Sequence, residues 1–250
     1  VDRERDHVFA PSLLWLMVGQ RTADAITRPL ARLARKGIEV RVGNVEHIDP
    51  DRRIVTVAGE KIAADYLVIT LGADLAPDVI PGLVQAGHNF YTRSGAESLW
   101  SALRNLRAGR IVVLTAAPAY KCPAAPYEGA MLIDDSFRRQ GLRERVQIEL
   151  YAAEPAPMGV AGPHVSSAVT QLLAAKRISY HPEHQVTAVD ADRKRLTFAN
   201  GTEVDFDLLA YVPPHRAPAV IRDSGLTGES GWMSVDRHTL QTRWPNVFAI

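Results

Sequence analysis

The single cysteine of the chain, Cys122, is the residue whose type and surroundings point most directly to chemistry. It lies in the segment YKCPAAPYE, residues 120–128, where Lys121 precedes it and prolines follow it. The thiolate is the nucleophilic form of cysteine, and an ammonium group or a helix N-terminus beside the sulfur favours that form. The alternative is an inert cysteine that only fills the core. We predict that Cys122 is a reactive thiol, with Lys121 as the charge that favours its thiolate.

The flanking elements place this segment between a strand and a helix. Residues 109–117 (GRIVVLTAA) read as a short buried strand, and residues 127–140 carry apolar side chains at helical spacing. In a dinucleotide-binding βαβ unit the same crossover reads G-x-G-x-x-G, because the pyrophosphate approaches the backbone at the helix N-terminus. No glycine occurs between Gly109 and Gly129. The cysteine segment therefore occupies the place of a phosphate loop.

Composition and charge limit the class of protein. With 46% hydrophobic and 23% charged residues the chain is typical of globular proteins, and its net charge of +1 gives no sign of a nucleic-acid partner. One cysteine excludes an internal disulfide framework, which fits a reducing compartment. The sequence has neither an apolar run of about eighteen residues nor a signal-peptide pattern. We expect a cytoplasmic protein and leave peripheral membrane contact open.

The first half of the chain predicts a helix followed by several strands. Thr22 is a suitable cap, apolar residues follow at helical spacing and Gly37 is a typical stop, so a helix is expected over residues 22–36. A second helix is expected near residues 97–107. Alternating or continuous apolar runs predict strands at 38–42, 45–49, 53–57 and 65–70.

The second half alternates strands with helices and then repeats the strand-rich plan of the first half. Strands are predicted at 110–115 and 146–152, and helices at 127–140 and 165–175. This order favours a parallel sheet. A β-meander is expected to follow at 186–190, 195–198 and 207–212. We predict an α/β fold of two tandem Rossmann-like units, each with an inserted β-meander.

These features resemble the flavoproteins with two dinucleotide-binding domains, the disulfide-reductase-like superfamily. Within it, the segment YKCPAAPYE is similar to the cysteine motif of the sulfide:quinone oxidoreductases and of the flavoprotein subunit of flavocytochrome c sulfide dehydrogenase. HVFAPS, residues 7–12, resembles the loop after the second strand of those enzymes. NVFAI, residues 246–250, resembles the strand that leads into their flavin-binding Gly-Asp pair. The resemblance runs through most of the chain.

The resemblance implies a three-layer FAD/NAD(P)-binding fold that is truncated at both ends. Residues 1–106 would form a partial FAD-binding-type domain, residues 107–228 a second Rossmann-like domain, and residues 229–250 a segment that returns to the first. The glycine turn for the FAD pyrophosphate, the Gly-Asp pair and the second redox cysteine of the family would lie outside this sequence. We therefore expect FAD in the complete protein, and weak or absent FAD binding by this chain.

The resemblance also implies roles for individual residues. Cys122 would attack as a thiolate, carry the sulfur and pass two electrons to FAD, with sulfide or a small thiol as substrate and a quinone or cytochrome as acceptor. Asp2 would hydrogen-bond the adenosine ribose, unless it is only a solvated charge, and Gly72 is alternatively a plain turn glycine. The residues expected to contact the cofactor are Asp2, Pro11, Val45, Thr70, Gly72 and Ala73.

Two groups of histidines are weaker candidates. His164 lies just before a predicted helix, where it either relays protons to a quinone or caps the helix. His181 and His184 frame the sequence HPEH, which resembles a metal motif, but no cysteine or carboxylate cluster surrounds it. We interpret HPEH as a solvated loop and predict no metal site.

Three classes of function fit these observations. The first is an FAD-dependent sulfide oxidoreductase. The second is a pyridine-nucleotide-dependent flavoprotein such as a type II NADH dehydrogenase, which would need the phosphate loop that residues 115–123 lack. The third is a non-catalytic fragment that binds no flavin. We also expect a homo-oligomer, because strands without a neighbour tend to pair with another chain.

Overall fold

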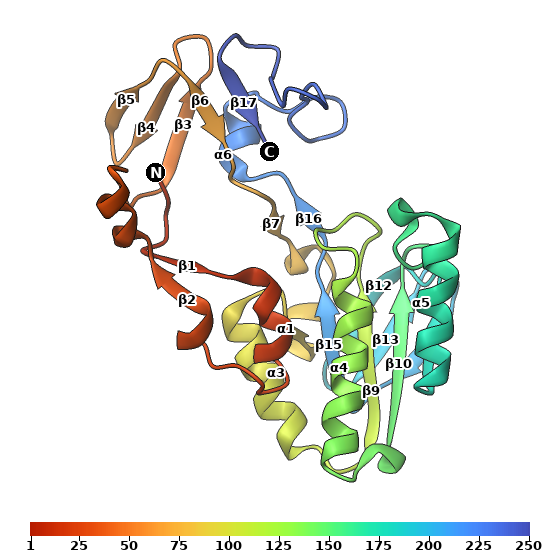
Figure 1. The fold of residues 1–250 in the computed structure, drawn as a ribbon. Coiled ribbons are helices and arrows are strands. Elements are labelled where there is room, and N and C mark those ends of the chain that lie inside the picture. The colour runs from red at the N-terminus through yellow and green to blue at the C-terminus, as the bar shows by residue number, and fades with distance from the viewer. The chain divides into compact units, whose positions relative to one another are not determined.

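The computed structural model describes all 250 residues, which form two compact units (Figure 1). Unit 1 comprises Val1–His7, Thr27–Leu75 and His215–Ile250. Unit 2 comprises Val8–Ile26 and Ala76–Pro214. Each unit is therefore assembled from segments that are distant in the sequence.

This division differs from the expected boundaries at residues 106 and 228, because packing and not chain order defines the units. Leu99 and Leu103 of α3 (Arg93–Asn105) are fully buried in the main core of unit 2. In the same way, Ile221 of α6 (Ala219–Asp223) lies in the core of unit 1.

Unit 2 is built on a parallel sheet with the strand order β11-β10-β9-β15-β8. Every neighbouring pair in it is parallel, as the alternation of strands and helices predicts. The strands are β8 (His88–Asn89), β9 (Gly109–Thr115), β10 (Val146–Ala152), β11 (Ile178–His181) and β15 (Leu208–Val212). Parallel neighbours need crossover connections, which the helices supply.

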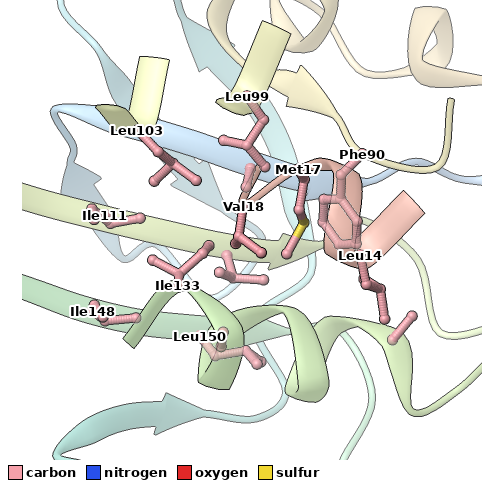
Figure 2. Packing of buried hydrophobic residues seen from close by; sticks show 14 of the residues in the cluster. Leu14, Met17, Val18, Phe90, Leu99, Leu103, Ile111, Ile133, Ile148 and Leu150 are labelled. Atoms are coloured by element: carbon pink, nitrogen blue, oxygen red, sulfur yellow. The ribbon is translucent and has the colours of Figure 1, made fainter. Parts of the chain in front are cut away.

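Helices α4 (Ala125–Arg139) and α5 (Pro163–Ala175) connect β9 to β10 and β10 to β11. With α3 and the short helix α1 (Leu13–Leu16), α4 covers one face of the sheet. None of the helices combines the length and the apolar character that a membrane crossing needs. Figure 2 shows side chains of this core, among them Leu14, Met17, Val18, Phe90, Leu99, Leu103, Ile111, Ile133, Ile148 and Leu150.

The other face of the sheet is covered by an antiparallel three-stranded meander. Ile111 and Val113 of β9 pack under the helices, whereas Val112 and Leu114 pack with the meander residue Phe198. This alternation follows from the two-residue period of a strand. The meander consists of β12 (Val186–Asp190), β13 (Arg195–Phe198) and β14 (Glu203–Asp205).

The expected third strand of this meander, residues 207–212, belongs instead to the parallel sheet as β15. All five residues of β15 are buried, which is typical of a strand covered on both faces. Shorter elements of unit 2 are α2 (Leu83–Ala86) and the 3₁₀ turns η1 (Ala10–Ser12), η2 (Asp24–Ile26), η4 (Pro77–Val79), η5 (Arg143–Arg145) and η6 (Gly159–Ala161).

Unit 1 repeats the plan on a smaller scale. Its meander, β3 (Val45–Asp49), β4 (Ile54–Val57) and β5 (Glu60–Ala63), is antiparallel. Its parallel pair is β6 (Leu67–Ile69) with β17 (Val247–Ala249). The remaining strands are β1 (Asp6–Val8), which pairs with β2 (Thr27–Pro29), and β7 (Asp74–Leu75), which pairs with β16 (His215–Arg216).

The helix expected over residues 22–36 is wrong. The segment forms η2, then strand β2, then the 3₁₀ helix η3 (Leu30–Lys36). Pro29 ends β2, and a proline inside a helix removes a hydrogen bond and clashes with the preceding turn. The expected stop is confirmed, because Gly37 adopts the left-handed conformation at the end of η3. Of the strand expected at 38–42, only an isolated bridge between Val42 and Asp2 forms.

Candidate functional site

The structure confirms that Cys122 lies between a strand and a helix, because β9 ends at Thr115 and α4 begins at Ala125. Cys122 is exposed, and its backbone has a φ of 56°, in the left-handed region that few residues other than glycine adopt. Its carbonyl accepts a hydrogen bond from the N–H of Ala125 at 3.0 Å. The backbone of the cysteine segment thus turns sharply into the first turn of α4.

A tyrosine from a neighbouring strand end secures this turn. The hydroxyl of Tyr91, just after β8, donates to the carbonyl of Lys121 at 2.9 Å and to that of Cys122 at 3.2 Å. Burial raises the pKa of Tyr91, and repulsion by negative charge on Cys122 or Glu154 raises it further. The hydroxyl therefore remains protonated at neutral pH and can serve as the donor in both bonds.

Cys122 lines a small, mainly apolar cavity of about 160 Å³ in unit 2. Pro11, expected to contact the cofactor, and the expected catalytic residues Lys121 and Cys122 line this same cavity, while their roles stay predictions. The walls are formed by Ala10, Pro11, Leu13, Leu14, Phe90, Tyr91, Lys121, Cys122 and Ala125. The thiol therefore lies among mainly apolar side chains, with the charged Lys121 beside it.

A buried carboxylate that was not predicted from the sequence accepts hydrogen bonds from the cysteine segment. Glu154, two residues after β10, accepts hydrogen bonds from the hydroxyls of Thr115 at 2.6 Å, Tyr127 at 2.6 Å and Tyr120. Burial, together with the charge of Glu154, raises the pKa of Tyr120. A signal for Glu154 existed, because an acidic residue after the second strand of a βαβ unit commonly binds a ribose hydroxyl.

Four of the residues expected to contact the cofactor line one cavity of about 450 Å³ in unit 1. They are Asp2, Val45, Thr70 and Ala73. The carboxylate of Asp2 accepts the N–H of Glu4 at 2.9 Å, and its backbone bonds to Arg41 and Gly43. The geometry thus gathers these four residues, while their role in binding stays a prediction.

Gly72, also expected to contact the cofactor, lines a second cavity of unit 1, which has a volume of about 350 Å³ and mainly apolar walls. It has a φ of 68°, so the turn reading of this glycine fits its backbone. Leu71 lines both cavities of unit 1, whereas Gly72 lines only the second. Gly72 is therefore adjacent in sequence to the cavity of Asp2 but does not line it.

His164 does not line the cavity of Cys122. It is exposed in the first turn of α5. A catalytic role for His164 therefore has no geometric support, and its capping role is not seen either, because no side chain caps α5.

The interpretation of HPEH as a solvated loop is wrong, because both histidines are partly buried among aromatic rings. His181 stacks on Tyr151 with ring centroids 4.2 Å apart, and His184 packs edge-on against Phe198 at 5.2 Å. Burial lowers the pKa of His181, although Glu149 opposes that shift. No group of three His, Cys, Asp or Glu side chains in the structure could hold a metal ion.

Comparison with known proteins places the chain in a family. The sequence profile of the pyridine nucleotide-disulphide oxidoreductases matches residues 4–250. The chain belongs to this family. The parallel sheet, the crossover helices and the two meanders described above are accordingly those of its dinucleotide-binding fold.

Members named for sulfide chemistry are among its relatives. The chain is 26% identical to the mitochondrial sulfide:quinone oxidoreductase of Mus musculus over its whole length, and 30% identical to the sulfide-quinone reductase of Aquifex aeolicus over 87% of it. These matches cover 58% and 52% of the two relatives. The crystal structure of the sulfide:quinone oxidoreductase from Aquifex aeolicus aligns with a TM-score of 0.85 at 25% identity, over 99% of this chain and 60% of that one.

Proposed function

We propose that this chain carries the sulfur-handling site of an FAD-dependent oxidoreductase that oxidises sulfide and passes the electrons to a quinone. The observation that carries the proposal is the position of Cys122. It replaces the phosphate loop on the β9–α4 crossover and lines an apolar cavity. The chain spans little more than half of relatives named for this reaction, so the activity of the whole protein rests on this proposal.

The cavity of unit 1 fits one end of the flavin nucleotide that members of this family use. The carboxylate of Asp2 is a suitable acceptor for ribose hydroxyls, and Val45 and Thr70 offer backbone and side-chain polar groups beside it. No G-x-G-x-x-G turn for a pyrophosphate occurs in residues 1–250. These residues therefore suit the adenosine end, and we expect this chain alone to bind FAD weakly.

In the proposed reaction the chain's own residues bring sulfide to the thiol. Lys121, exposed beside Cys122, attracts the hydrosulfide anion. A Cys122 thiolate and a hydrosulfide anion that form one S–S bond give a persulfide anion, one proton and two electrons. When bound, the flavin supplies the chemistry that accepts those two electrons. Tyr91 holds the backbone of Cys122 throughout, and the apolar walls exclude water.

A pyridine-nucleotide reductase, the alternative function, finds no support at the site that it would need. Glu154 holds the position from which an acidic residue binds the ribose of NAD, but its oxygens already accept three hydroxyls of the chain itself. The crossover also lacks the glycines that let a pyrophosphate approach the backbone. Both features argue against NADH as the electron donor.

The test is the reduction of the flavin by sulfide. We expect that the purified protein, supplied with FAD, loses its flavin absorbance when sulfide is added and keeps it when NADH is added. A Cys122→Ser variant should bind flavin equally and lose the response to sulfide. Bleaching by NADH would instead support the pyridine-nucleotide alternative, and bound flavin that neither sulfide nor NADH reduces would support the non-catalytic one.

A further inference from the structure

A single buried oxygen atom holds both ends of the cysteine segment. Oε1 of Glu154 accepts a hydrogen bond from the hydroxyl of Tyr120 and another, at 2.6 Å, from that of Tyr127. Tyr120 comes two residues before Cys122, and Tyr127 comes five residues after it. The two tyrosines and the carboxylate therefore form a clamp across the segment that carries the thiol. We call Thr115, Tyr120, Tyr127 and Glu154 the carboxylate clamp.

The sheet fixes the other oxygen of the same carboxylate. Oε2 of Glu154 accepts the hydroxyl of Thr115, the last residue of β9, at 2.6 Å. The oxygen of Thr115 itself accepts the backbone N–H of Ala153 at 3.1 Å, so that its proton is directed toward Glu154. Only 9% of Glu154 is exposed. A buried charge that is held by three hydroxyls needs all three, since a lost donor leaves it poorly solvated.

The backbone of Cys122, inside the clamped segment, has a conformation that is strained for a residue with a side chain. For any residue that has a side chain, a left-handed backbone conformation is unfavourable in free energy. It persists where several surrounding interactions hold it in place. Cys122 has a φ of 56°, and Tyr91 bonds to its carbonyl from one side. Two residues before Cys122 in the chain, Tyr120 is held by Glu154. The carbonyl of Cys122 also accepts the N–H of Ala125, and the clamp adds restraints before and after this turn through Tyr120 and Tyr127.

We propose that Glu154 is a positioning residue for the thiol of Cys122, and that it acts through Tyr120 and Tyr127. The inference rests on the proposed function for its meaning, because Cys122 is the residue assigned there to sulfur. The test measures only the alkylation of Cys122. The positioning role can therefore fail while the proposed sulfide oxidation holds, and sulfide oxidation can fail while the positioning role holds.

The test compares two alkylating reagents on the full chain. The cavity of Cys122 has apolar walls, so a held thiol should react faster with N-phenylmaleimide, an apolar reagent, than with anionic iodoacetate, relative to free cysteine. Tyr120→Phe removes one donor of the clamp and keeps the ring, while Glu154→Leu removes the acceptor. We expect each to lower the ratio of the two rate constants about tenfold, the scale of one hydrogen bond to a charged group.

Two variants separate positioning from a general effect on folding. Glu154→Gln keeps an acceptor for both tyrosines and should restore most of the ratio. Tyr151→Phe is the matched control, because the hydroxyl of Tyr151, also buried in unit 2, donates to Glu149 at 2.8 Å, away from the cysteine segment. The Tyr151→Phe variant should leave the ratio of the two rate constants unchanged, even if its melting temperature falls as far as that of Tyr120→Phe.

Three results would overturn the proposal. A ratio in Tyr120→Phe equal to that of the unchanged protein would show that the clamp does not position the thiol. An equal fall in Tyr151→Phe would show that any loss of stability has the same effect. A ratio in Glu154→Gln as low as in Glu154→Leu would show that the hydrogen bonds to the tyrosines are not what matters. If Glu154→Leu does not fold, Tyr120→Phe and Glu154→Gln still decide the outcome.

Discussion

At the scale of the residue, Cys122 combines an exposed side chain with a restrained backbone. Its φ of 56° costs on the order of 1–3 kcal/mol, and the hydrogen bond from Tyr91 to its carbonyl is one of the interactions that offset this cost. Strained residues that persist in a fold cluster at sites where geometry matters for chemistry. The strain at Cys122 is compatible with a reacting thiol, but eight other non-glycine residues share this conformation, so it does not by itself indicate reactivity.

The first prediction concerns the charge beside that thiol. Replacement of Lys121 by alanine should slow the alkylation of Cys122 at pH 7 by iodoacetate, because an ammonium group attracts the anionic reagent. Lys121 is exposed, so water and salt weaken the effect, and we expect a change of only about two- to threefold at low salt. The rate constants are measured by mass spectrometry.

Lys61 provides the control, since it is an exposed lysine on β5, remote in sequence from the cysteine. A Lys61→Ala variant should react at the unchanged rate. The difference caused by Lys121→Ala should also shrink at about 1 M salt, where the Debye length falls to about 3 Å. A difference that is independent of salt would mean that Lys121 acts through the backbone and not through its charge.

At the scale of the element, α4 is tied to its neighbours by a buried ion pair. Asp134 of α4 is fully buried and bonds to Arg143 in η5 and, at 2.7 Å, to Arg138. Arg143 also donates to the carbonyls of Lys176 and Arg177, at the end of α5. Burial opposes the charge of Asp134, but the hydrogen bonds from Arg138 and Arg143 outweigh it and lower its pKa.

The second prediction follows from this network. Asp134→Asn should lower the free energy of unfolding by about 3–5 kcal/mol at pH 7, because it leaves Arg143 buried without a counter-charge. The control Asp135→Asn removes the half-buried partner of the exposed Arg139 and should change the free energy by less than about 1 kcal/mol. Both values come from urea denaturation.

The same pair has a predictable dependence on pH. The folded-state pKa of Asp134 is lowered, so its contribution to stability is present above the ordinary pKa of about 3.9 and is lost as the pH falls through the folded-state value. The difference between the unchanged protein and Asp134→Asn should therefore narrow in acid. A difference that stays constant down to pH 3 would contradict the assignment of this stability to the ionised carboxylate.

At the scale of the whole molecule, unit 1 leaves apolar groups on a strand edge. β6 has β17 as its only strand neighbour, and Val68 on β6 is 58% exposed. Leu71 in the same unit is exposed as well. Open edges with apolar side chains favour pairing with another chain, which is the physical basis for the expected homo-oligomer.

The third prediction tests that association. The chain as given should have a molar mass above that of the 27.4 kDa monomer in light scattering at micromolar concentration, and Val68→Lys should shift it toward the monomer. The control is Val79→Lys, because Val79 is equally exposed in η4 but lies outside every sheet. A monomer at all concentrations, or an equal response to the control variant, would mean that β6 does not mediate association.

Local signals in the sequence determined much of this protein. The run at 109–117 and the spacing after residue 127 placed Cys122 between a strand and a helix, and β9 and α4 confirm it. Such signals suffice because periodicity and turn residues act within a few positions of the chain. The similar plan of the two halves and the left-handed stop at Gly37 were within reach for the same reason.

Only the tertiary structure decided which residues meet. Helix α3 joined unit 2 through its buried face, and Thr115, Tyr120 and Tyr127 converged on Glu154 from separate elements. Hydrogen bonds and packing of this kind join residues that are distant in sequence, so no local pattern contains them. The segment 22–36 shows the converse, because pairing of β2 with β1 and the proline that ends β2 overrode a helical pattern.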